Sequence, residues 1–376
     1  MKDKRETKYN LIAIIALSVI PIVGVLGTIC YVFVNGVVWQ EPFLLVIFWI
    51  ITGLAITVGY HRLFSHRSFK AHPILEWILV FAGSAALENS ILKWCSDHRR
   101  HHKHLDTDKD PYSITKGFFH AHIGWILFDK SEPINNVKDL DAKPAIRFQY
   151  KYYIPLFIVF SVFLPVTLGF LWGRPLGALF WGVFLRITLV HHFTYSINSI
   201  CHYIGKRPYD YQSTSRDSWY ASLITFGEGY HNYHHKFQWD YRNGIRWFNF
   251  DPSKWFIWIL SKVGLARELK RVDQYQIMKA KVSNFMNQIN EILDSLPNQI
   301  KHSYHEKLNI INIKIQNFEK YHRSAEEEVI RYLSDKKLNV LSRKIIHNKR
   351  KLRNIEYHAI IKTLSVMLFS IQTKQF

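Results

Sequence analysis

Eight histidines in three short clusters are the residues of this chain most able to do chemistry. The chain has 376 residues, and the clusters are His61-Arg-Leu-Phe-Ser-His66, His98-Arg-Arg-His101-His102 and His231-Asn-Tyr-His234-His235. Each imidazole has ring nitrogens that need partners, so core packing explains these spacings poorly. Because neutral imidazole is a good ligand for Fe, Zn, Cu and Ni, the clusters predict a site for first-row transition metals.

The spacing within each cluster indicates how its rings are directed. On a helix, residues at i, i+3 and i+4 share one face. The second and third clusters both follow this rule, so each can direct three rings at one place. His61 and His66 are five residues apart and would diverge on a straight helix. We therefore expect a break in the helix that reorients His66.

A ninth imidazole, His202, ends a later apolar stretch, and Asn198 precedes it by four residues on the same helical face. Nine imidazoles exceed what one ion can hold, so the sequence predicts two metal ions. Zinc needs only three or four ligands per ion and offers no redox chemistry. A substrate that reaches such a site from a membrane would be apolar. It would offer many C–H bonds and few bonds to hydrolyse, which favours a pair of redox-active metal ions.

Four apolar stretches are long enough to cross a membrane. They cover about residues 11–34, 43–60, 153–172 and 176–200. The loop at 35–42 contains no Lys or Arg, which places it on the non-cytoplasmic side. The sequence therefore predicts an all-α membrane protein with four transmembrane helices.

A fifth apolar segment, from Ile74 to Leu92, lies between the first and second histidine clusters. A crossing there would put these clusters on opposite faces of the membrane, where they could not share a site. We expect a partly buried or re-entrant helix that does not cross. With four spans, both termini are then cytoplasmic and all three clusters lie at the same face.

Charge and cysteine content exclude several classes. The formal charge is +20, but no nucleic-acid-binding module accompanies it, and membrane proteins concentrate Lys and Arg on the cytoplasmic side. The three cysteines form no Cys-x-x-Cys pair, which excludes a zinc ribbon. Residues 266–376 contain 21 Lys and Arg against 11 Asp and Glu. We divide the chain into a membrane domain at 1–265 and a basic cytoplasmic helical extension at 266–376.

The motifs resemble those of the acyl-CoA desaturase family, typified by stearoyl-CoA delta-9 desaturase. The similarity covers about residues 8 to 263 in matching order and spacing. It is carried by His61-Arg-Leu-Phe-Ser-His66-Arg, Asp97-His98-Arg-Arg-His101-His102-Lys, Asn198-Ser-Ile-Cys-His202 and Gly227-Glu-Gly-Tyr-His231-Asn-Tyr-His234-His235.

The resemblance implies the membrane fatty acid desaturase fold, with four transmembrane helices and a cytoplasmic helical cap. It also implies an oxidoreductase of fatty acid biosynthesis that uses O₂ and two electrons to insert a cis double bond, at delta-9, into a saturated acyl chain. It implies that two irons are held by the nine histidines His61, His66, His98, His101, His102, His202, His231, His234 and His235, and that Asn198 contacts one iron through a water. No further catalytic residue is expected. By the same resemblance Asn10, Asn89, Asp97 and Lys130 touch the CoA group, and Tyr195 stands where the family has a tunnel-lining Trp.

Two departures from the family pattern concern the carrier of the acyl chain. Ser96 and Asp129 stand where CoA-binding members carry arginines, and an aspartate would repel a phosphate. Acyl-CoA remains the expected substrate, with an acyl-lipid as the alternative. The chain has no His-Pro-Gly-Gly haem motif, so we expect a separate ferredoxin or cytochrome b5-type electron donor. The basic extension is expected to rest on anionic lipid, in a bacterial inner membrane rather than the endoplasmic reticulum.

Two rival interpretations remain open. A related membrane di-iron hydroxylase or alkane monooxygenase uses similar histidine clusters, although Asn198, His202 and the Gly-Glu-Gly-Tyr segment favour desaturation. A metal sensor or transporter would place polar ligands along a path near mid-membrane rather than at one border. New monounsaturated or hydroxylated chains in an expressing host would separate the two enzymes.

Overall fold

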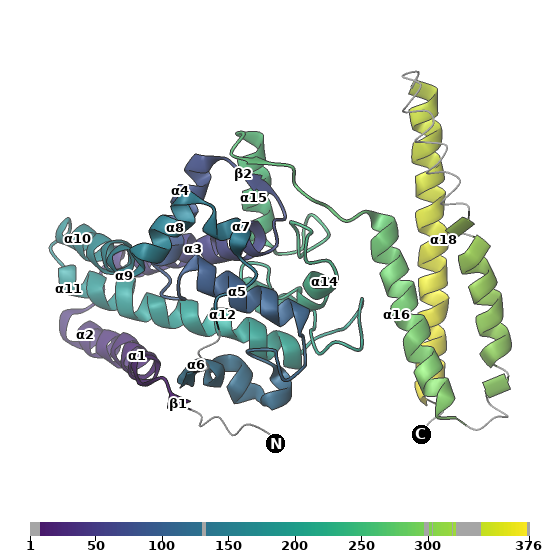
Figure 1. Cartoon of the computed structure of the whole chain (residues 1–376), viewed down its shortest axis with the longest axis horizontal. Helices are drawn as coiled ribbons and strands as arrows, with labels where there is room; N and C mark the ends of the chain where they lie inside the picture. Colours follow the sequence, from purple (N-terminus) through teal and green to yellow (C-terminus); the bar gives the residue numbers. More distant parts are fainter. Residues whose placement is uncertain are drawn as a thin grey trace. The chain divides into compact units, whose positions relative to one another are not determined.

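The computed structural model describes residues 8–129, 133–296, 301–302, 304–317, 319–320 and 340–373. The described residues are mostly helical, and the chain forms two compact units (Figure 1). The first unit contains Met1–Arg207 and Gln212–Arg271, and the second contains Pro208–Tyr211 and Val272–Phe376.

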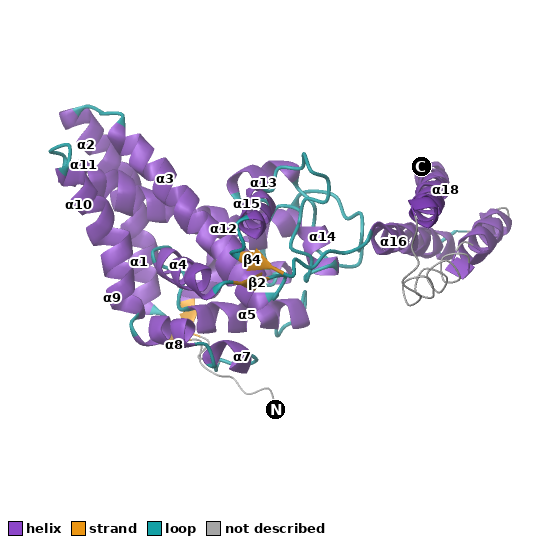
Figure 2. Ribbon diagram, turned by 90° about the horizontal axis from the view of Figure 1, so that it is seen from above, coloured by secondary structure: helices purple, strands orange, loops and turns teal. Residues whose placement is uncertain are grey.

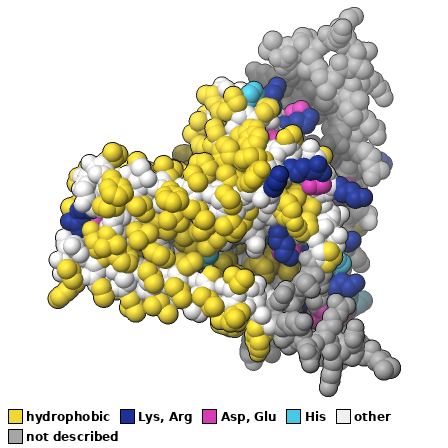
Figure 3. Space-filling view, turned by 60° about the vertical axis from the view of Figure 1, so that its left-hand side comes forward, with side chains coloured by type: hydrophobic (Ala, Val, Ile, Leu, Met, Phe, Trp, Pro, Cys, Tyr) yellow, Lys and Arg dark blue, Asp and Glu magenta, His cyan; other side chains and the backbone are white. Residues whose placement is uncertain are grey.

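Four long apolar helices dominate the first unit, as the sequence predicted. They are Leu11–Asn35, Gln40–Ser65, Tyr153–Phe170 and Pro175–Tyr203. All four have the length and composition needed to cross a membrane. Figure 3 shows hydrophobic side chains spread over the side of the unit that carries these helices.

Each long helix changes hydrogen-bonding pattern along its length, because every one includes a π-helical segment. The successive pieces are α1 (Leu11–Ile22), η1 (Val23–Gly27) and α2 (Thr28–Asn35); α3 (Gln40–Leu54) and η2 (Ala55–Ser65); α9 (Tyr153–Phe157), η5 (Ile158–Phe163) and α10 (Leu164–Phe170); and α11 (Pro175–Ala178), η6 (Leu179–Leu185) and α12 (Arg186–Tyr203). Such segments often occur at functional sites, and η2 carries the first histidine cluster.

An ion pair with a buried carboxylate joins the two hairpin loops that connect these helices. Arg174 follows the turn at Gly173, and its Nε lies 2.9 Å from Glu41 Oε1 at the start of α3. The Tyr31 hydroxyl of α2 donates to the same carboxylate oxygen at 3.0 Å. Since Glu41 is fully buried, its paired charge fixes the two helical hairpins against each other at this end.

The apolar segment at 74–92 forms two pieces rather than one. Helix α4 (Pro73–Ser84) begins after the N-cap His72, and α5 (Ile91–Lys103) begins after the N-cap Ser90. The 12 residues of α4 rise only about 18 Å, whereas the hydrocarbon core of a membrane is about 30 Å thick.

Shorter elements complete the first unit. The helices are η3 (Ile114–Lys116), η4 (His120–Gly124), α6 (Trp125–Leu127), α7 (Lys138–Asp141), α8 (Pro144–Lys151), α13 (Trp219–Ile224), α14 (His231–Lys236) and α15 (Pro252–Lys262). Two antiparallel strand pairs join distant segments: β1 (Lys8–Tyr9) pairs with β3 (Phe128–Asp129), and β2 (Lys70–Ala71) pairs with β4 (Ala266–Arg267) (Figure 2). The second pair ties the chain after η2 to the end of α15.

The second unit is built around α16 (Gln274–Asp294) and α18 (Val340–Thr373), with further helical residues between 301 and 320. Its core contains Met278, Val282, Met286, Ile289 and Leu293, packed with Leu364, Leu368 and Ile371. These residues recur at helical spacing. The short segment Pro208–Tyr211 belongs to this unit, where the Tyr211 backbone N–H donates to Asn284 Oδ1 at 2.7 Å.

Candidate metal centre

The π-helical segment η2 explains the five-residue spacing of the first cluster. In a π-helix the backbone bonds run from i to i+5, and the His66 N–H donates to the His61 carbonyl at 3.1 Å. The two rings therefore lie on one side of the segment, with centroids 4.7 Å apart. The predicted break is a change of helical period, and His66 caps the segment.

Three further helices contribute the remaining rings. The last turns of α5 carry the second cluster, the short helix α14 carries the third, and the end of α12 carries His202. Although these helices are far apart in the sequence, the structure brings all nine predicted histidines together in two neighbouring groups.

We call these the five-histidine group and the four-histidine group. The five-histidine group consists of His61, His66, His98, His102 and His234, and the four-histidine group of His101, His202, His231 and His235. Within each group, the candidate ligand atoms lie within 4.8 Å of one another. Across the described residues, each group contains histidine alone.

Contacts between ring nitrogens show why both groups suit a cation. His234 Nε2 lies 3.0 Å from both His61 Nε2 and His102 Nε2. In the other group, His235 Nε2 lies 3.2 Å from His101 Nε2 and 3.0 Å from His231 Nε2. A neutral nitrogen has either one proton or one lone pair, so it cannot bond well to two such neighbours. A central cation would instead accept every lone pair.

Six of the candidate ligands outside the spans are held in the neutral form that binds metal. Burial, followed by the charges of neighbouring imidazoles, lowers the pKa of each well below 6.5; they are His66, His98, His102, His231, His234 and His235. The lone pairs of their ring nitrogens are therefore available to bind a metal ion at neutral pH.

A buried charge network supports the five-histidine group. His61 Nδ1 lies 2.9 Å from Glu228 Oε2, and the Arg62 guanidinium lies 2.9 Å from both Glu228 Oε1 and Asp251 Oδ1. Burial alone would raise the pKa of Glu228, but Arg62 and His61 hold it below its ordinary value. The carboxylate thus stays ionised and orients the His61 ring, as outer partners of metal-binding histidines do.

Different partners support the four-histidine group. His101 Nδ1 lies 2.9 Å from Asp110 Oδ1, with both side chains buried. His202 Nδ1 lies 2.7 Å from the Thr214 hydroxyl, which donates to Asp106 Oδ1 at 2.5 Å. The sequence analysis did not identify Thr214 or Asp106, because neither belongs to a repeated spacing.

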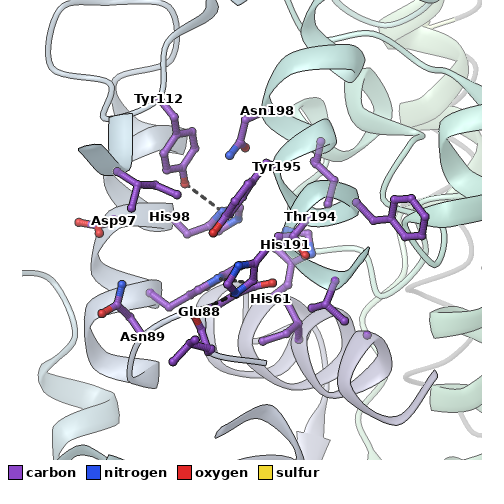
Figure 4. Close-up of a pocket in the computed structure, with 18 of the residues that line it drawn as sticks. His61, Glu88, Asn89, Asp97, His98, Tyr112, His191, Thr194, Tyr195 and Asn198 are labelled. Atoms are coloured by element: carbon purple, nitrogen blue, oxygen red, sulfur yellow. Dashed lines mark hydrogen bonds between the residues drawn. The ribbon is translucent and has the colours of Figure 1, made fainter. Parts of the chain in front are cut away.

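An apolar cavity of about 420 Å³ opens from the histidines into the bundle of spanning helices. His61, His98 and His231 lie at its metal end, together with Asn198, four residues before His202 on α12. Figure 4 shows Asn198 and Tyr195 directed toward the same space as His98. Asn198 is thus close enough to this end for the water-mediated role expected of it, which stays a prediction.

Glu88 is a polar residue of the cavity wall that the sequence analysis did not assign. Its Oε2 accepts from Trp94 Nε1 at 3.2 Å, and Trp94 stacks on His98 with ring centroids 4.9 Å apart. Burial raises the pKa of Glu88 to about 7. The side chain is therefore largely uncharged at slightly acidic pH, as suits an apolar cavity.

A second, more polar hollow of about 560 Å³ adjoins the first. The predicted substrate contacts Asn10, Asn89 and Asp97 line both hollows, whereas Tyr195 lines only the apolar one. Three cationic side chains, Lys93, Arg100 and Lys109, line the polar hollow together with three aspartates, Asp97, Asp108 and Asp110. Of these, Lys93 and Arg100 also pair with Asp97.

The remaining predicted positions are placed as follows. Lys130 and the side chain of Asp129 lie outside the described residues. The Ser96 hydroxyl accepts from the Asn135 backbone N–H at 2.9 Å. Asn10 has a structural role as well, since its side chain caps α1 through the Ala13 N–H.

Comparison with known proteins gives a consistent picture. A family profile described as "Fatty acid desaturase" matches residues 38–257. A "Probable acyl-CoA desaturase" of Schizosaccharomyces pombe is 41% identical over 265 residues, which cover 69% of this chain and 54% of that protein. The chain thus spans about half the length of this relative.

Two other relatives differ in the substrate and position that their names give. An "sn-1 stearoyl-lipid 9-desaturase" of Anabaena variabilis is 38% identical over 237 residues, covering 61% of this chain and 84% of that protein. An "Acyl-CoA Delta(11) desaturase" of Spodoptera littoralis is 34% identical over 284 residues, covering 73% and 83%.

Proposed function

Because the chain belongs to the fatty acid desaturase family, we propose that it is an O₂-dependent membrane acyl desaturase with a di-iron centre. It inserts a cis double bond, at delta-9, into a saturated acyl chain. One observation carries this proposal most strongly: nine histidines form two groups at the metal end of an apolar cavity.

The nine imidazole ligands fit two iron ions, one in each histidine group. Such ions, when bound, supply the oxidising power that removes hydrogen from unactivated carbon. In the overall reaction two hydrogens of the chain, two electrons from the donor and two protons reduce O₂ to two waters. The residues of this chain hold the ions and exclude bulk water, and the cavity wall positions the methylene groups.

The polar hollow is where a charged carrier would bind. Lys93, Arg100 and Lys109 offer cations to a phosphate-bearing group, while Asn10 and Asn89 lie where this hollow meets the apolar one. We propose acyl-CoA as the substrate, in keeping with the name of the S. pombe relative. The name of the A. variabilis relative makes a glycerolipid-bound chain the alternative.

Electrons would come from a separate ferredoxin or cytochrome b5-type donor at the cytoplasmic face. In this orientation both termini and the histidine groups lie on the cytoplasmic side, and the loop at 35–42 lies on the other. The proposed location is a bacterial inner membrane.

Lipid profiling of an expressing host tests the proposal. Host cells that lack the corresponding activity should gain monounsaturated chains when they express the protein. His102→Ala should abolish them, whereas His305→Ala, at an exposed residue of the second unit, should not. Hydroxylated chains in place of unsaturated ones would contradict desaturation and support the related hydroxylase.

A further inference from the structure

A buried tyrosine contacts one candidate ligand of each histidine group. The hydroxyl oxygen of Tyr112, Oη, lies 3.4 Å from His98 Nδ1 of the five-histidine group, as the dashed line in Figure 4 shows. The Tyr112 ring lies against His101 of the four-histidine group, with ring centroids 4.5 Å apart. Tyr112 is only 5% exposed and lines the apolar cavity together with His98 and Asn198. Its phenol is therefore a polar group of the cavity wall that touches both histidine groups.

Neighbouring residues hold Tyr112 in this position. Its backbone N–H donates to Asp110 Oδ1 at 3.2 Å, and the same carboxylate oxygen lies 2.9 Å from His101 Nδ1. Trp125 packs on the Tyr112 ring with centroids 5.0 Å apart. The carboxylate that orients His101 thus also fixes the backbone of Tyr112, so the tyrosine and the ligand that it contacts are placed together.

The ligand role of His98 determines the direction of its hydrogen bond to Tyr112. His98 Nε2 faces the other rings of its group, 2.8 Å from His66 Nε2. An imidazole that binds a metal through Nε2 has its proton on Nδ1, and this N–H donates to an outer partner. His98 Nδ1 therefore donates to Tyr112 Oη, which accepts.

The proton of the Tyr112 hydroxyl is then left for another acceptor. A phenol has one O–H to donate in addition to its acceptor lone pairs. Among the residues that the structure describes, His98 is the only hydrogen-bond partner of this hydroxyl. The hydroxyl therefore offers an uncharged, buried donor to a molecule at the metal end of the cavity, where Asn198 also lies.

We propose that the Tyr112 hydroxyl donates a hydrogen bond to dioxygen when this co-substrate binds at the histidine groups, and that Tyr112 is thereby a further catalytic residue. This inference rests on the proposed function and deepens it. As electrons from the donor reduce dioxygen, negative charge builds on the oxygen atoms. A fixed donor in a site without bulk water stabilises such charge far more than water does.

Azide binding to the purified, full-length, iron-loaded protein tests the inference without measuring turnover. Azide is a small anion that binds ferric iron and accepts hydrogen bonds, so it takes the place of the oxygen ligand. Its dissociation constant is measured by optical titration of the wild type and of Tyr112→Phe, which keeps the ring against His101 and removes the hydroxyl. We expect azide to bind the phenylalanine variant about tenfold more weakly, because a hydrogen bond to a charged group is lost.

Two further proteins separate donation to the ligand from support of His98. Tyr112→3-fluorotyrosine makes the phenol a stronger donor and a weaker acceptor, so azide should bind more tightly than to the wild type. If the hydroxyl only supported His98, the fluorinated protein would instead hold iron less well, with no gain in azide affinity. Burial raises the pKa of Tyr112, so the fluorinated phenol keeps its proton.

The matched control removes a tyrosine hydroxyl elsewhere. Tyr304 of the second unit is 7% exposed, and its hydroxyl lies 3.4 Å from Ser370 Oγ. Tyr304→Phe should leave the azide affinity unchanged.

An azide affinity equal to that of the wild type in both Tyr112→Phe and the fluorinated protein would overturn this inference while leaving desaturation intact. If Tyr112→Phe does not accumulate or does not hold iron, the fluorinated protein alone decides. The products of the wild type test the proposed function separately. Hydroxylated chains would contradict desaturation, but the azide affinities would still show whether Tyr112 donates to the oxygen ligand.

Discussion

The two histidine groups differ in how the surrounding protein supports them. In the five-histidine group, His61 faces Glu228, whose charge is neutralised by Arg62 within a network that is almost fully buried. In the four-histidine group, His101 faces a carboxylate and His202 faces only a hydroxyl, that of Thr214. The carboxylate that supports the first group is thus itself paired with a buried arginine.

The groups also differ in the number of nitrogen ligands that they offer to an ion. Five nitrogens can nearly complete the coordination of one ion, whereas four leave room for another ligand. Asn198 lies on the same face of α12 as His202 of the smaller group and lines the cavity. The smaller group therefore has room for a further ligand on the side of Asn198.

Loss of a ligand should have the largest effect. His→Ala at His98 or His102 of the five-histidine group, or at His231 or His235 of the four-histidine group, should abolish product while the chain stays in the membrane fraction. Metal content should fall further for His235→Ala than for His102→Ala, because the larger group retains four nitrogens. Elemental analysis and host lipid profiles measure both effects, and full activity in any of these variants would exclude that residue as a ligand.

Substitution of the carboxylates that support each histidine group should have the next largest effect, and the effect should differ between the two groups. Glu228→Gln and Asp110→Asn should each lower metal affinity or activity about 10- to 100-fold, as is usual for outer partners of metal ligands. Glu228→Gln should also lower the free energy of unfolding by about 3 kcal/mol, since it leaves the buried Arg62 with one carboxylate fewer. Thermal unfolding in detergent measures that difference, and equal stability of the two variants would contradict the contrast drawn here.

Acid should weaken both groups. A histidine whose folded-state pKa is lowered takes up its proton mainly in the unfolded chain, so stability rises with pH below the ordinary imidazole pKa. Because the pKa values of these histidines are lowered, we expect the protein to lose stability and bound metal as the pH falls below 6.5. Unfolding temperature and metal content between pH 8 and pH 5 are the measurements, and a flat profile would mean that these rings are not buried as neutral groups.

Removal of the second unit should have the smallest effect. The cut belongs after Arg271, because the Lys270 backbone N–H donates to Ser68 at 2.8 Å within the first unit. A chain that ends at residue 271 should keep its metal and its product, since all nine histidines lie in the first unit. Loss of metal from this truncated chain would show that the centre depends on residues 272–376.

The sequence alone predicted the four long helices and the convergence of nine histidines, because apolar length and i, i+3, i+4 spacing are local properties. It did not predict how His61 and His66 come to share a side, since a π-helical segment has no simple sequence signal. Thr214 was missed for another reason. Its role depends on a contact with His202 that no repeated spacing of residues indicates.

Metal analysis of the purified full-length protein tests the central claim most directly. The account predicts about two iron atoms per chain, with one lost when the four-histidine group loses His235. One zinc and no iron per chain would contradict it and support a metal sensor or transporter instead.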